Sequence, residues 1–388
     1  MKKQLYSILT LLLVVAFMTA CGGQPTAAPA APAAPAAPAA PAATLPPAAP
    51  AATSAPVIQT QIVQITSTAQ ALQTCKVGFS FNRFDSILLK AWQDYMTSYS
   101  AKIGPSQGLN FVWTFNVADG DVSRQASNIQ DLLNAGNDVI VARAEDAAAI
   151  GASAKAVMDA GKPFVTFDRA SAGYQPTLHV GADSYTQAVT TATQFAAILQ
   201  KNNVKNPQCI ELEGDLKDQN AVLRSQGWHD VEKQLKAWKT IVQVPTEWDA
   251  NKFYTGTANA LQAHPEANCM FVASDFAFQS VEKALQEAGK LAPTGDPKHI
   301  WMAAQDVNPP GLEGLQKGYI DVVTSYDAYY HATTLVDALV KLCKGEPMGV
   351  AKLLVPGRVV TQDNYKTLPN LWALEYQNVT FVTPTPQP

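Results

Sequence analysis

Short apolar segments alternate with longer segments of helical periodicity from the start of the folded region. Apolar runs that predict buried strands occur at residues 76–81, 109–115, 138–141, 163–167 and 178–180. Between them, apolar positions spaced three or four residues apart predict helices at residues 87–99, 124–135 and 147–160, the last two each followed by a glycine. This alternation is typical of a parallel sheet with crossover helices.

The same alternation starts again after residue 183. Strands are predicted at residues 209–212, 240–244, 269–273, 300–304 and 322–325. Helices are predicted at residues 187–201, 221–238, 253–263, 276–288 and 329–342. We therefore expect an α/β protein with two doubly wound parallel-sheet lobes. Ligands of such sheets bind beyond the carboxyl ends of the strands, so a cleft shared by the two lobes is expected.

The first 74 residues do not fit this pattern. Lys2 and Lys3 precede a short apolar run and then Cys21, which indicates a lipoprotein signal peptide and lipobox over residues 1–23. An ordinary signal peptide with an incidental cysteine is the alternative. Residues 24–74, rich in Ala and Pro in their first part, are expected to form an extended tether. Residues 381–388 are expected to be a disordered tail.

Charge and motif content exclude several classes of protein. Removal of the signal peptide takes away two lysines and brings the formal net charge from −4 to −6, with no basic patch for nucleic acid. No GxGxxG follows the first strand, and P-loop, GxSxG and HExxH motifs are absent, so we do not expect an enzyme. No metal site or cofactor is predicted, and contact with a membrane is expected only through the lipid anchor.

Four cysteines remain after Cys21, and they form no CxxC pair and no zinc-type spacing. In an oxidising compartment they could form two disulfides. Composition alone leaves buried free thiols as an equal alternative.

Several segments together resemble one family. Residues 159–169 (DAGKPFVTFDR), 128–141 (NIQDLLNAGNDVIV) and 180–183 (VGAD) are similar to signatures of type I periplasmic binding proteins of the ribose, galactose and xylose group. Residues 305–307 (QDV) and 218–221 (DQNA) resemble the xylose-type binders in particular. The order and spacing of these segments carry the resemblance, which covers residues 75 to about 372.

The resemblance implies a Venus-flytrap fold with a three-segment hinge. It implies an N-terminal lobe of residues 75–182 plus 328–352 and a C-terminal lobe of residues 183–327 plus 353–380. It also implies a monomer outside the cytoplasmic membrane that delivers a small polar ligand, such as a pentose or hexose, to an ABC transporter permease and ATPase.

The resemblance and the strand ends together nominate the ligand-binding residues. Asp168 and Arg169 match the family's sugar-binding pair, and a carboxylate beside a guanidinium can read a vicinal diol. A structural ion pair is the alternative for these two residues. The other candidates are Arg83, Phe84, Asp85, Arg143, Asn220, Trp248, Ser274, Asp275, Asp306 and Asp327, with Glu145 on the same wall as Arg143. For Asn220 and Asp306 a helix cap is the alternative, and for Trp248 simple packing.

Within the implied fold the four cysteines fall into two pairs. Cys209 and Cys269 begin neighbouring strands of the C-terminal lobe, while Cys75 begins the first strand and Cys343 ends a helix that runs toward the same end. We therefore expect disulfides Cys75–Cys343 and Cys209–Cys269.

Two other functions share this fold. A sugar-sensing repressor would need a helix-turn-helix before the first lobe, where this chain has the signal peptide and tether. A ligand-sensing receptor subunit for a chemotaxis or two-component system differs only in its partners, so it stays an alternative to transport.

The lipobox interpretation predicts that Cys21→Ser abolishes lipid attachment, because the serine cannot carry the thioether-linked lipid. The measurement is partition of the processed protein into detergent. A variant that partitions like the wild type would contradict the interpretation.

Overall fold

The computed structural model describes residues 71–378. The signal peptide with Cys21, the tether up to residue 70 and the tail from residue 379 lie outside the described residues. The chain divides into two units, Met1–Thr66 and Ser67–Pro388, and everything below concerns the second. In it, two six-stranded sheets form two α/β lobes, as the sequence predicted.

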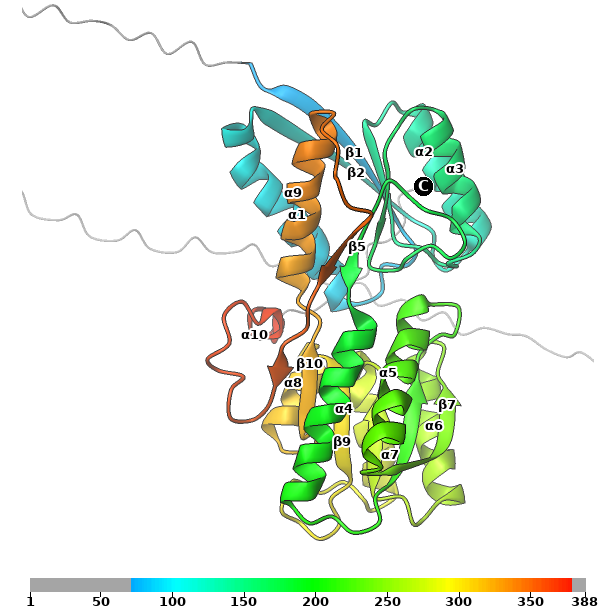
Figure 1. Cartoon of the computed structure of the whole chain (residues 1–388), viewed down its shortest axis with the longest axis vertical. Helices are drawn as coiled ribbons and strands as arrows, with labels where there is room; N and C mark the ends of the chain where they lie inside the picture. The colour runs from blue at the N-terminus through cyan, green and yellow to red at the C-terminus, as the bar shows by residue number, and fades with distance from the viewer. Residues whose placement is uncertain (1–70, 379–388) are drawn as a thin grey trace, which may run out of the picture. The chain divides into compact units, whose positions relative to one another are not determined.

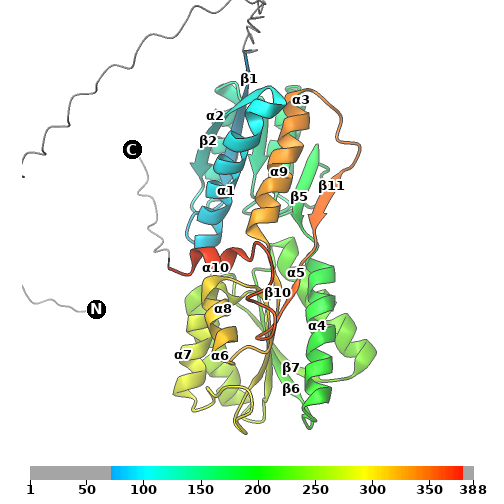
Figure 2. The same ribbon diagram turned by 90° about the vertical axis from the view of Figure 1, so that its left-hand side faces the viewer.

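The N-terminal lobe is built on a fully parallel sheet of order β11-β5-β4-β3-β1-β2. Its strands are β1 (Gln73–Phe81), β2 (Leu109–Val117), β3 (Val139–Ala142), β4 (Phe164–Phe167), β5 (Leu178–Ala182) and β11 (Lys352–Val355). Its helices are α1 (Ile87–Ile103), the 3₁₀ turn η1 (Gly104–Gln107), α2 (Val122–Asn134), α3 (Ile150–Asp159) and α9 (Ala328–Cys343). Helices α1 and α9 lie side by side on one face of the sheet (Figures 1 and 2).

The C-terminal lobe repeats this plan with the order β12-β10-β9-β8-β6-β7. Its strands are β6 (Gln208–Glu213), β7 (Lys239–Pro245), β8 (Cys269–Val272), β9 (Trp301–Asp306), β10 (Val322–Ser325) and β12 (Val359–Val360), of which only β12 pairs antiparallel. Its helices are α4 (Ser184–Lys201), α5 (Gln219–Leu235), α6 (Ala250–Ala263), the 3₁₀ turn η2 (Asp275–Ala277), α7 (Phe278–Glu287) and α8 (Pro309–Gln316).

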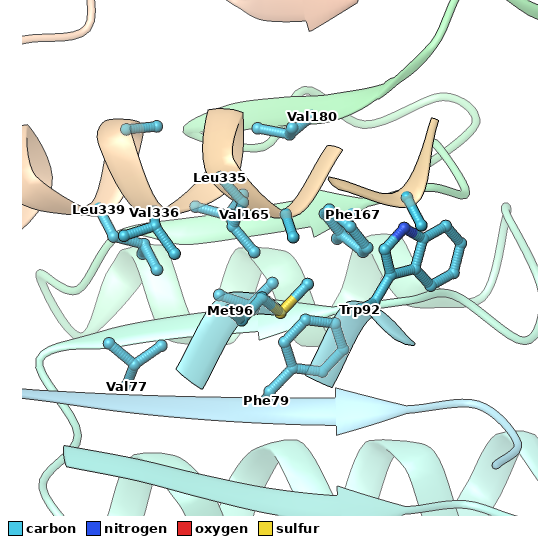
Figure 3. Packing of buried hydrophobic residues seen from close by; sticks show 14 of the residues in the cluster. Val77, Phe79, Trp92, Met96, Val165, Phe167, Val180, Leu335, Val336 and Leu339 are labelled. Carbon is cyan, nitrogen blue, oxygen red and sulfur yellow. The ribbon is translucent and has the colours of Figure 1, made fainter. Parts of the chain in front are cut away.

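Apolar strand residues form the core of each lobe. In the N-terminal lobe, Val77, Phe79 and Val165 from the sheet pack against α1 and α9 (Figure 3). Trp92 of α1 is fully buried there, and its ring meets that of Phe167 edge to face with centroids 5.0 Å apart. Burial of such an aromatic side chain contributes about 3 kcal/mol, so these contacts hold the helices on the sheet.

Aspartates begin four of the helices that follow strands. Asp121, Asp183, Asp218 and Asp249 are the N-cap residues of α2, α4, α5 and α6, and each accepts hydrogen bonds from backbone amides of the first turn. Such a cap stabilises a helix by about 1 kcal/mol. The caps also place carboxylates along the edge where the strands end.

The third crossing between the lobes lies later than expected. The lobe boundaries expected from the sequence put the third crossing after residue 352, but β11 pairs with β5 through Val355, so the chain leaves the N-terminal lobe at residues 356–358. The sheet pairing extends the N-terminal lobe beyond the expected boundary at residue 352. Gly357 is required at this crossing, because a Cβ there would lie 2.3 Å from Thr324 Cγ2.

A short helix after the third crossing contacts both lobes. Helix α10 (Trp372–Tyr376) packs against α1 of the N-terminal lobe and α8 of the C-terminal lobe. Trp372 is buried in the N-terminal core, whereas its neighbours Leu371 and Ala373 belong to the C-terminal core. The family resemblance implied that this stretch belongs to the C-terminal lobe alone.

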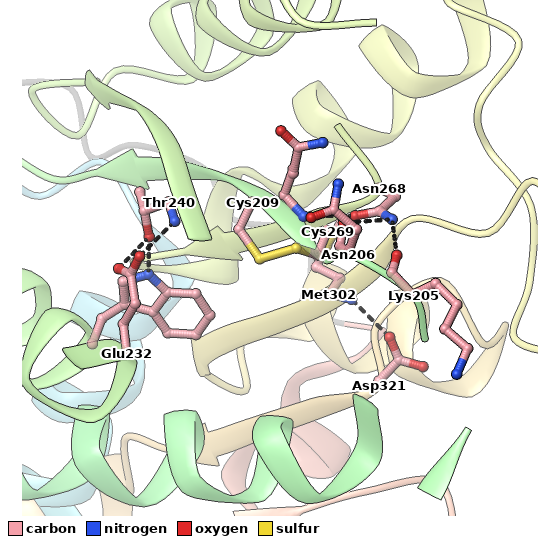
Figure 4. Close-up of a disulfide and its surroundings, with 11 residues drawn as sticks. Lys205, Asn206, Cys209, Glu232, Thr240, Asn268, Cys269, Met302 and Asp321 are labelled. Atoms are coloured by element: carbon pink, nitrogen blue, oxygen red, sulfur yellow. Dashed lines mark hydrogen bonds between the residues drawn. A yellow bond between two sulfur atoms is a disulfide. The ribbon is translucent and has the colours of Figure 1, made fainter. Parts of the chain in front are cut away.

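Both expected disulfides are present in the structure. Cys75 and Cys343 are joined with their Cα atoms 5.8 Å apart, and Cys209 and Cys269 with theirs 4.3 Å apart. The second pair links directly opposed residues of the parallel strands β6 and β8 (Figure 4). The cysteines of β1, β6 and β8 lie near the amino ends of their strands, away from the carboxyl ends where the ligand site is expected.

A histidine-centred cluster gives the C-terminal lobe a pH-dependent stability. His229 Nε2 lies 2.7 Å from Oε2 of the fully buried Glu211, and His229 Nδ1 lies 3.0 Å from Glu232. The hydrogen bond to Glu211 raises the pKa of His229 to about 9, against burial of the ring. The folded protein therefore binds this proton more tightly than the unfolded chain, whose histidine pKa is about 6.5.

We expect this contribution to be complete below about pH 6.5 and to disappear as the pH rises toward 9. The measurement is the free energy of unfolding of the wild type and His229→Gln at about pH 6 and pH 9.5. The wild type should be the more stable at the lower pH, and the difference should shrink at the higher one. A difference independent of pH would contradict the assignment.

Candidate functional site

The carboxyl ends of the strands from both lobes line one cavity of about 340 Å³. Nine predicted ligand-binding residues contribute to its wall: Arg83, Asp85, Arg143, Asp168, Arg169, Asn220, Trp248, Ser274 and Asp306, with Glu145 beside them. The cavity thus combines residues after β1, β3 and β4 with residues after β6, β7, β8 and β9, as expected for the ligand site of doubly wound sheets.

Asp168 is the most connected residue of the cavity. Its side chain is 4% exposed and forms short ion-pair and hydrogen-bond contacts with Arg143 Nε and the Tyr326 hydroxyl. Burial acts to raise the pKa of Asp168, but the charges of Arg143 and Arg169 outweigh burial and lower it. Asp168 is therefore a carboxylate at neutral pH.

Asn220 connects the two lobes at Asp168. Its Nδ2 donates to the backbone oxygen of Asp168 at 3.1 Å and to Oδ1 at 3.2 Å, while its Oδ1 accepts from Ser184 at 2.9 Å. The cap that α5 needs comes from Asp218, which accepts from the Asn220 amide. The side chain of Asn220 therefore does not cap α5 but links Asp168 to Ser184 at the cavity wall.

Arg169 crosses to the C-terminal lobe. Its Nε lies 3.1 Å from Oδ2 of Asp218, and its Nη1 lies 4.0 Å from Glu145. Burial, followed by the charge of Arg143, lowers the pKa of Arg169. Trp248 Nε1 donates to the same Asp218 oxygen at 3.1 Å, which holds the indole at the cavity wall.

Asp306, in the C-terminal lobe, forms a second buried ion pair at the cavity, with Arg224. Arg224 Nη2 and Nη1 lie 2.7 and 3.2 Å from its two oxygens, and Ser274 donates a short hydrogen bond to Oδ2. Arg224 also donates to the backbone oxygen of Ala273 at 2.6 Å and lies over the ring of Tyr326. The guanidinium is thereby held in one orientation.

Unfavourable backbone conformations concentrate at these strand ends. Asp168, Trp248 and Asp306 have φ angles of 65°, 55° and 97°, and Val307, a β-branched residue, has φ 58°. Such conformations cost about 1–3 kcal/mol each and cluster at ligand sites. Here they mark the points where the strands turn at the cavity.

At the cavity mouth, Arg83 is paired with Glu145 at 3.3 Å, and its side chain is 42% exposed. Glu145 also accepts from Asn82 Nδ2 at 2.7 Å. A side chain at Gly120 would meet the Arg83 guanidinium at 3.1 Å, so glycine leaves room for it. Asp85, exposed, completes this side of the mouth.

Three predicted residues lie outside the cavity wall. Phe84 is buried in the N-terminal core, with its ring centroid 5.1 Å from that of Phe81. Asp275 is fully buried and accepts from the backbone and side-chain nitrogens of Asn308 at 2.8 Å. Asp327 pairs with Arg358 at 2.6 Å, joining the second and third crossings. Burial, with the nearby charge of Asp306, raises the pKa of Asp275 well above its usual value.

Sequence reasoning missed several wall residues. Arg224 lies four residues after Asn220 on α5, so helical periodicity places the two on one face. Tyr326 directly follows β10, and Asn308 and Phe276 follow β9 and β8 closely, so the strand-end rule could have found them. Leu88 and Leu89, at the start of the predicted helix 87–99, also line the cavity and were not among the candidates.

Within residues 71–378, no group of three or more His, Cys, Asp and Glu side chains could hold a metal ion. The same part of the chain contains no helix that is both long and apolar enough to span a membrane.

Two doubly wound lobes with a shared polar cavity define a two-lobed ligand-binding protein. Comparison with known families agrees, since the family described as "Periplasmic binding protein domain" matches residues 77–347. The chain therefore belongs to the periplasmic binding protein family, has its type I fold and is a binding protein and not an enzyme.

Individual relatives are distant. A putative rhizopine-binding protein of Rhizobium meliloti is 24% identical over 77% of this chain and 94% of its own length. The ribose import binding protein RbsB of Escherichia coli is 23% identical over 58% of this chain and 72% of its own length. Among solved structures, a Bacillus halodurans solute-binding protein with bound myo-inositol has a TM-score of 0.66 at 22% identity and covers 80% of this chain and 99% of its own.

The Arg224–Asp306 pair provides a stability prediction. Arg224→Met leaves a buried carboxylate unpaired, so we expect a loss of about 3–5 kcal/mol in the free energy of unfolding, measured with denaturant. In Arg224→Met combined with Asp306→Asn the loss should be smaller than the sum of the single losses.

Lys155→Met is the matched control. It removes the exposed Lys155–Asp159 pair, whose side chains are 62% and 63% exposed, and should change stability by no more than about 0.5 kcal/mol. If Arg224→Met lowered the free energy of unfolding as little as the control does, the Arg224–Asp306 pair would not contribute to stability.

Proposed function

We propose that this protein is the extracytoplasmic, lipid-anchored binding component of an ABC importer and captures a neutral polyhydroxylated ligand, a monosaccharide or cyclic polyol. Cys21 would carry the lipid, and a permease with its ATPase would receive the ligand. The names of the relatives, which include ribose, D-apiose and xylitol binding, support a ligand of this class.

The charge balance of the cavity carries the proposal. Each guanidinium of its wall already has a carboxylate partner: Arg143 with Asp168, Arg169 with Asp218, Arg224 with Asp306 and Arg83 with Glu145. The remaining lining charges, on Asp85, Asp215, Glu247 and Asp249, are negative, and of these Glu247 is paired with Lys252 at 2.6 Å. An anionic ligand would meet no unpaired cation and several like charges, whereas hydroxyl groups can bond to both members of each ion pair.

The ion pairs also suggest how binding is coupled to closure. Asp168 lies in the N-terminal lobe and Asp306 in the C-terminal lobe, so one ligand can bond to both. A ligand that contacts both lobes binds the closed form more tightly and shifts the hinge equilibrium toward it. A permease that recognises the closed form would then receive only loaded protein.

The proposal predicts that neutral polyols bind and their anionic counterparts do not. Calorimetry on the wild type should detect D-ribose, D-xylose, D-galactose or myo-inositol, and should detect neither ribose 5-phosphate nor D-galacturonate. Tight binding of an anionic compound in preference to its neutral counterpart would contradict the proposal.

Asp168→Asn should weaken the binding of the best neutral ligand at least about tenfold, because the amide accepts fewer hydrogen bonds from hydroxyls. Asparagine is preferable to alanine, since Asp168 is nearly buried and its partner Arg143 would otherwise face an empty space. Asp159→Asn, on an exposed helix position, is the control and should leave affinity unchanged. If the wild type and both variants bound the ligand with equal affinity, Asp168 would not be part of the binding site.

A further inference from the structure

The cavity has an apolar wall that the binding of hydroxyl groups does not use. Leu88 and Leu89, in the first turn of α1, line it from the N-terminal lobe, and Phe276, in η2 after β8, lines it from the C-terminal lobe. These three residues are here called the apolar wall. Unlike the polar strand ends described above, they offer a ligand no side-chain hydrogen bond.

The apolar wall is fixed in position by the cores of both lobes. Leu89 is buried, and Leu88, partly exposed, packs against the N-terminal core. Phe276 packs against the C-terminal core and meets Phe253 edge to face with ring centroids 5.5 Å apart. Because Leu88 and Phe276 keep part of their surface exposed at the cavity, apolar surface is presented there from both lobes.

The size of the cavity brings this wall into contact with the ligand. A volume of about 340 Å³ is at the small end of the range for ligand sites. A ring whose hydroxyls bond to the Asp168 and Asp306 ion pairs would share this small space with Leu88 and Phe276, which line the same cavity. A hydroxyl turned toward that wall would lose its hydrogen bonds to water without replacement, whereas an alkyl group would be buried favourably.

We propose that the cavity is built for a polyol that carries one apolar substituent, such as an O-methyl, C-methyl or other short alkyl group, seated between Leu88 and Phe276. The substituent touches both lobes, so it favours the closed form as the hydroxyls do. This specificity rests on the proposed binding of neutral polyols and adds a second determinant to it.

The test is calorimetry with matched pairs on the full chain. Each free polyol, D-ribose, D-xylose, D-galactose and myo-inositol, is compared with its alkylated forms: the methyl α- and β-glycosides, 6-deoxygalactose and the mono-O-methyl inositols. We expect the tightest ligand to be an alkylated form that binds about tenfold more tightly than its parent, the gain typical of one methyl group in an apolar pocket.

Variants assign the preference to the wall. Leu88→Ser and Phe276→Ser should each reduce the ratio of the two affinities to about two or less. Val122→Ser, which changes an exposed apolar residue outside the cavity wall, should keep the wild-type ratio. If a serine variant does not fold, Leu88→Ala or Phe276→Ala replaces it. The preference for an alkylated ligand is tested by the ratio of the two affinities in the wild type, which needs no variant.

The outcomes separate this inference from the proposed function. Free polyols that bind as tightly as every alkylated form would overturn the inference and leave the proposed function intact. A preference for alkylated forms that persists in the variants would overturn the assignment to Leu88 and Phe276. Failure of every neutral polyol to bind would overturn both.

Discussion

The site depends on burying charge without leaving it unpaired. Four guanidinium groups, each with a partner carboxylate, lie around one small cavity, and three of these pairs are largely withdrawn from water. Removing an ion from water costs several kcal/mol, which only a well-oriented partner of opposite sign offsets. Two hydroxyl groups add to this pairing, since Tyr326 donates to Asp168 and Ser274 donates to Asp306.

The ion pairs also limit what the cavity can recognise. Because the guanidinium groups are already neutralised, they act as fixed donors rather than as free positive charges. The apolar wall of Leu88, Leu89 and Phe276 provides no such groups. Under the proposed function, hydroxyl-bearing and apolar parts of a ligand would face different sides of the cavity, and the cavity would thereby set the orientation of the ligand.

The alternation of strands and helices was sufficient to predict both lobes, since long periodic segments leave little choice of secondary structure. It failed where elements are short or follow no apolar repeat: β12 has two residues, α10 follows a loop, and α8 begins with Pro309 and Pro310. The boundary at residue 352 was wrong because the pairing of β11 with β5 depends on distant residues.

Side-chain direction set a second limit on prediction. The strand-end rule and the family motifs brought together Asp168, Arg169 and Asp306, but could not distinguish Ser274, which lines the cavity, from Asp275, which points into the protein. Phe84 is a second example. It directly follows Arg83, which lines the cavity, but its own ring points into the core and meets Phe81. Arg224 was missed because it lies within a helix, one turn after Asn220, where strand ends give no signal.

Helix α10 has a consequence for the entropy of the unliganded protein. With Trp372 in one core and Leu371 and Ala373 in the other, the chain ties the lobes together at a fourth place besides the three crossings. An arrangement of the lobes that displaced α10 would expose Trp372 or its neighbours to water, and this exposure disfavours it. Fewer arrangements then remain in the unliganded protein, which would lower the entropic cost of closing it around a ligand.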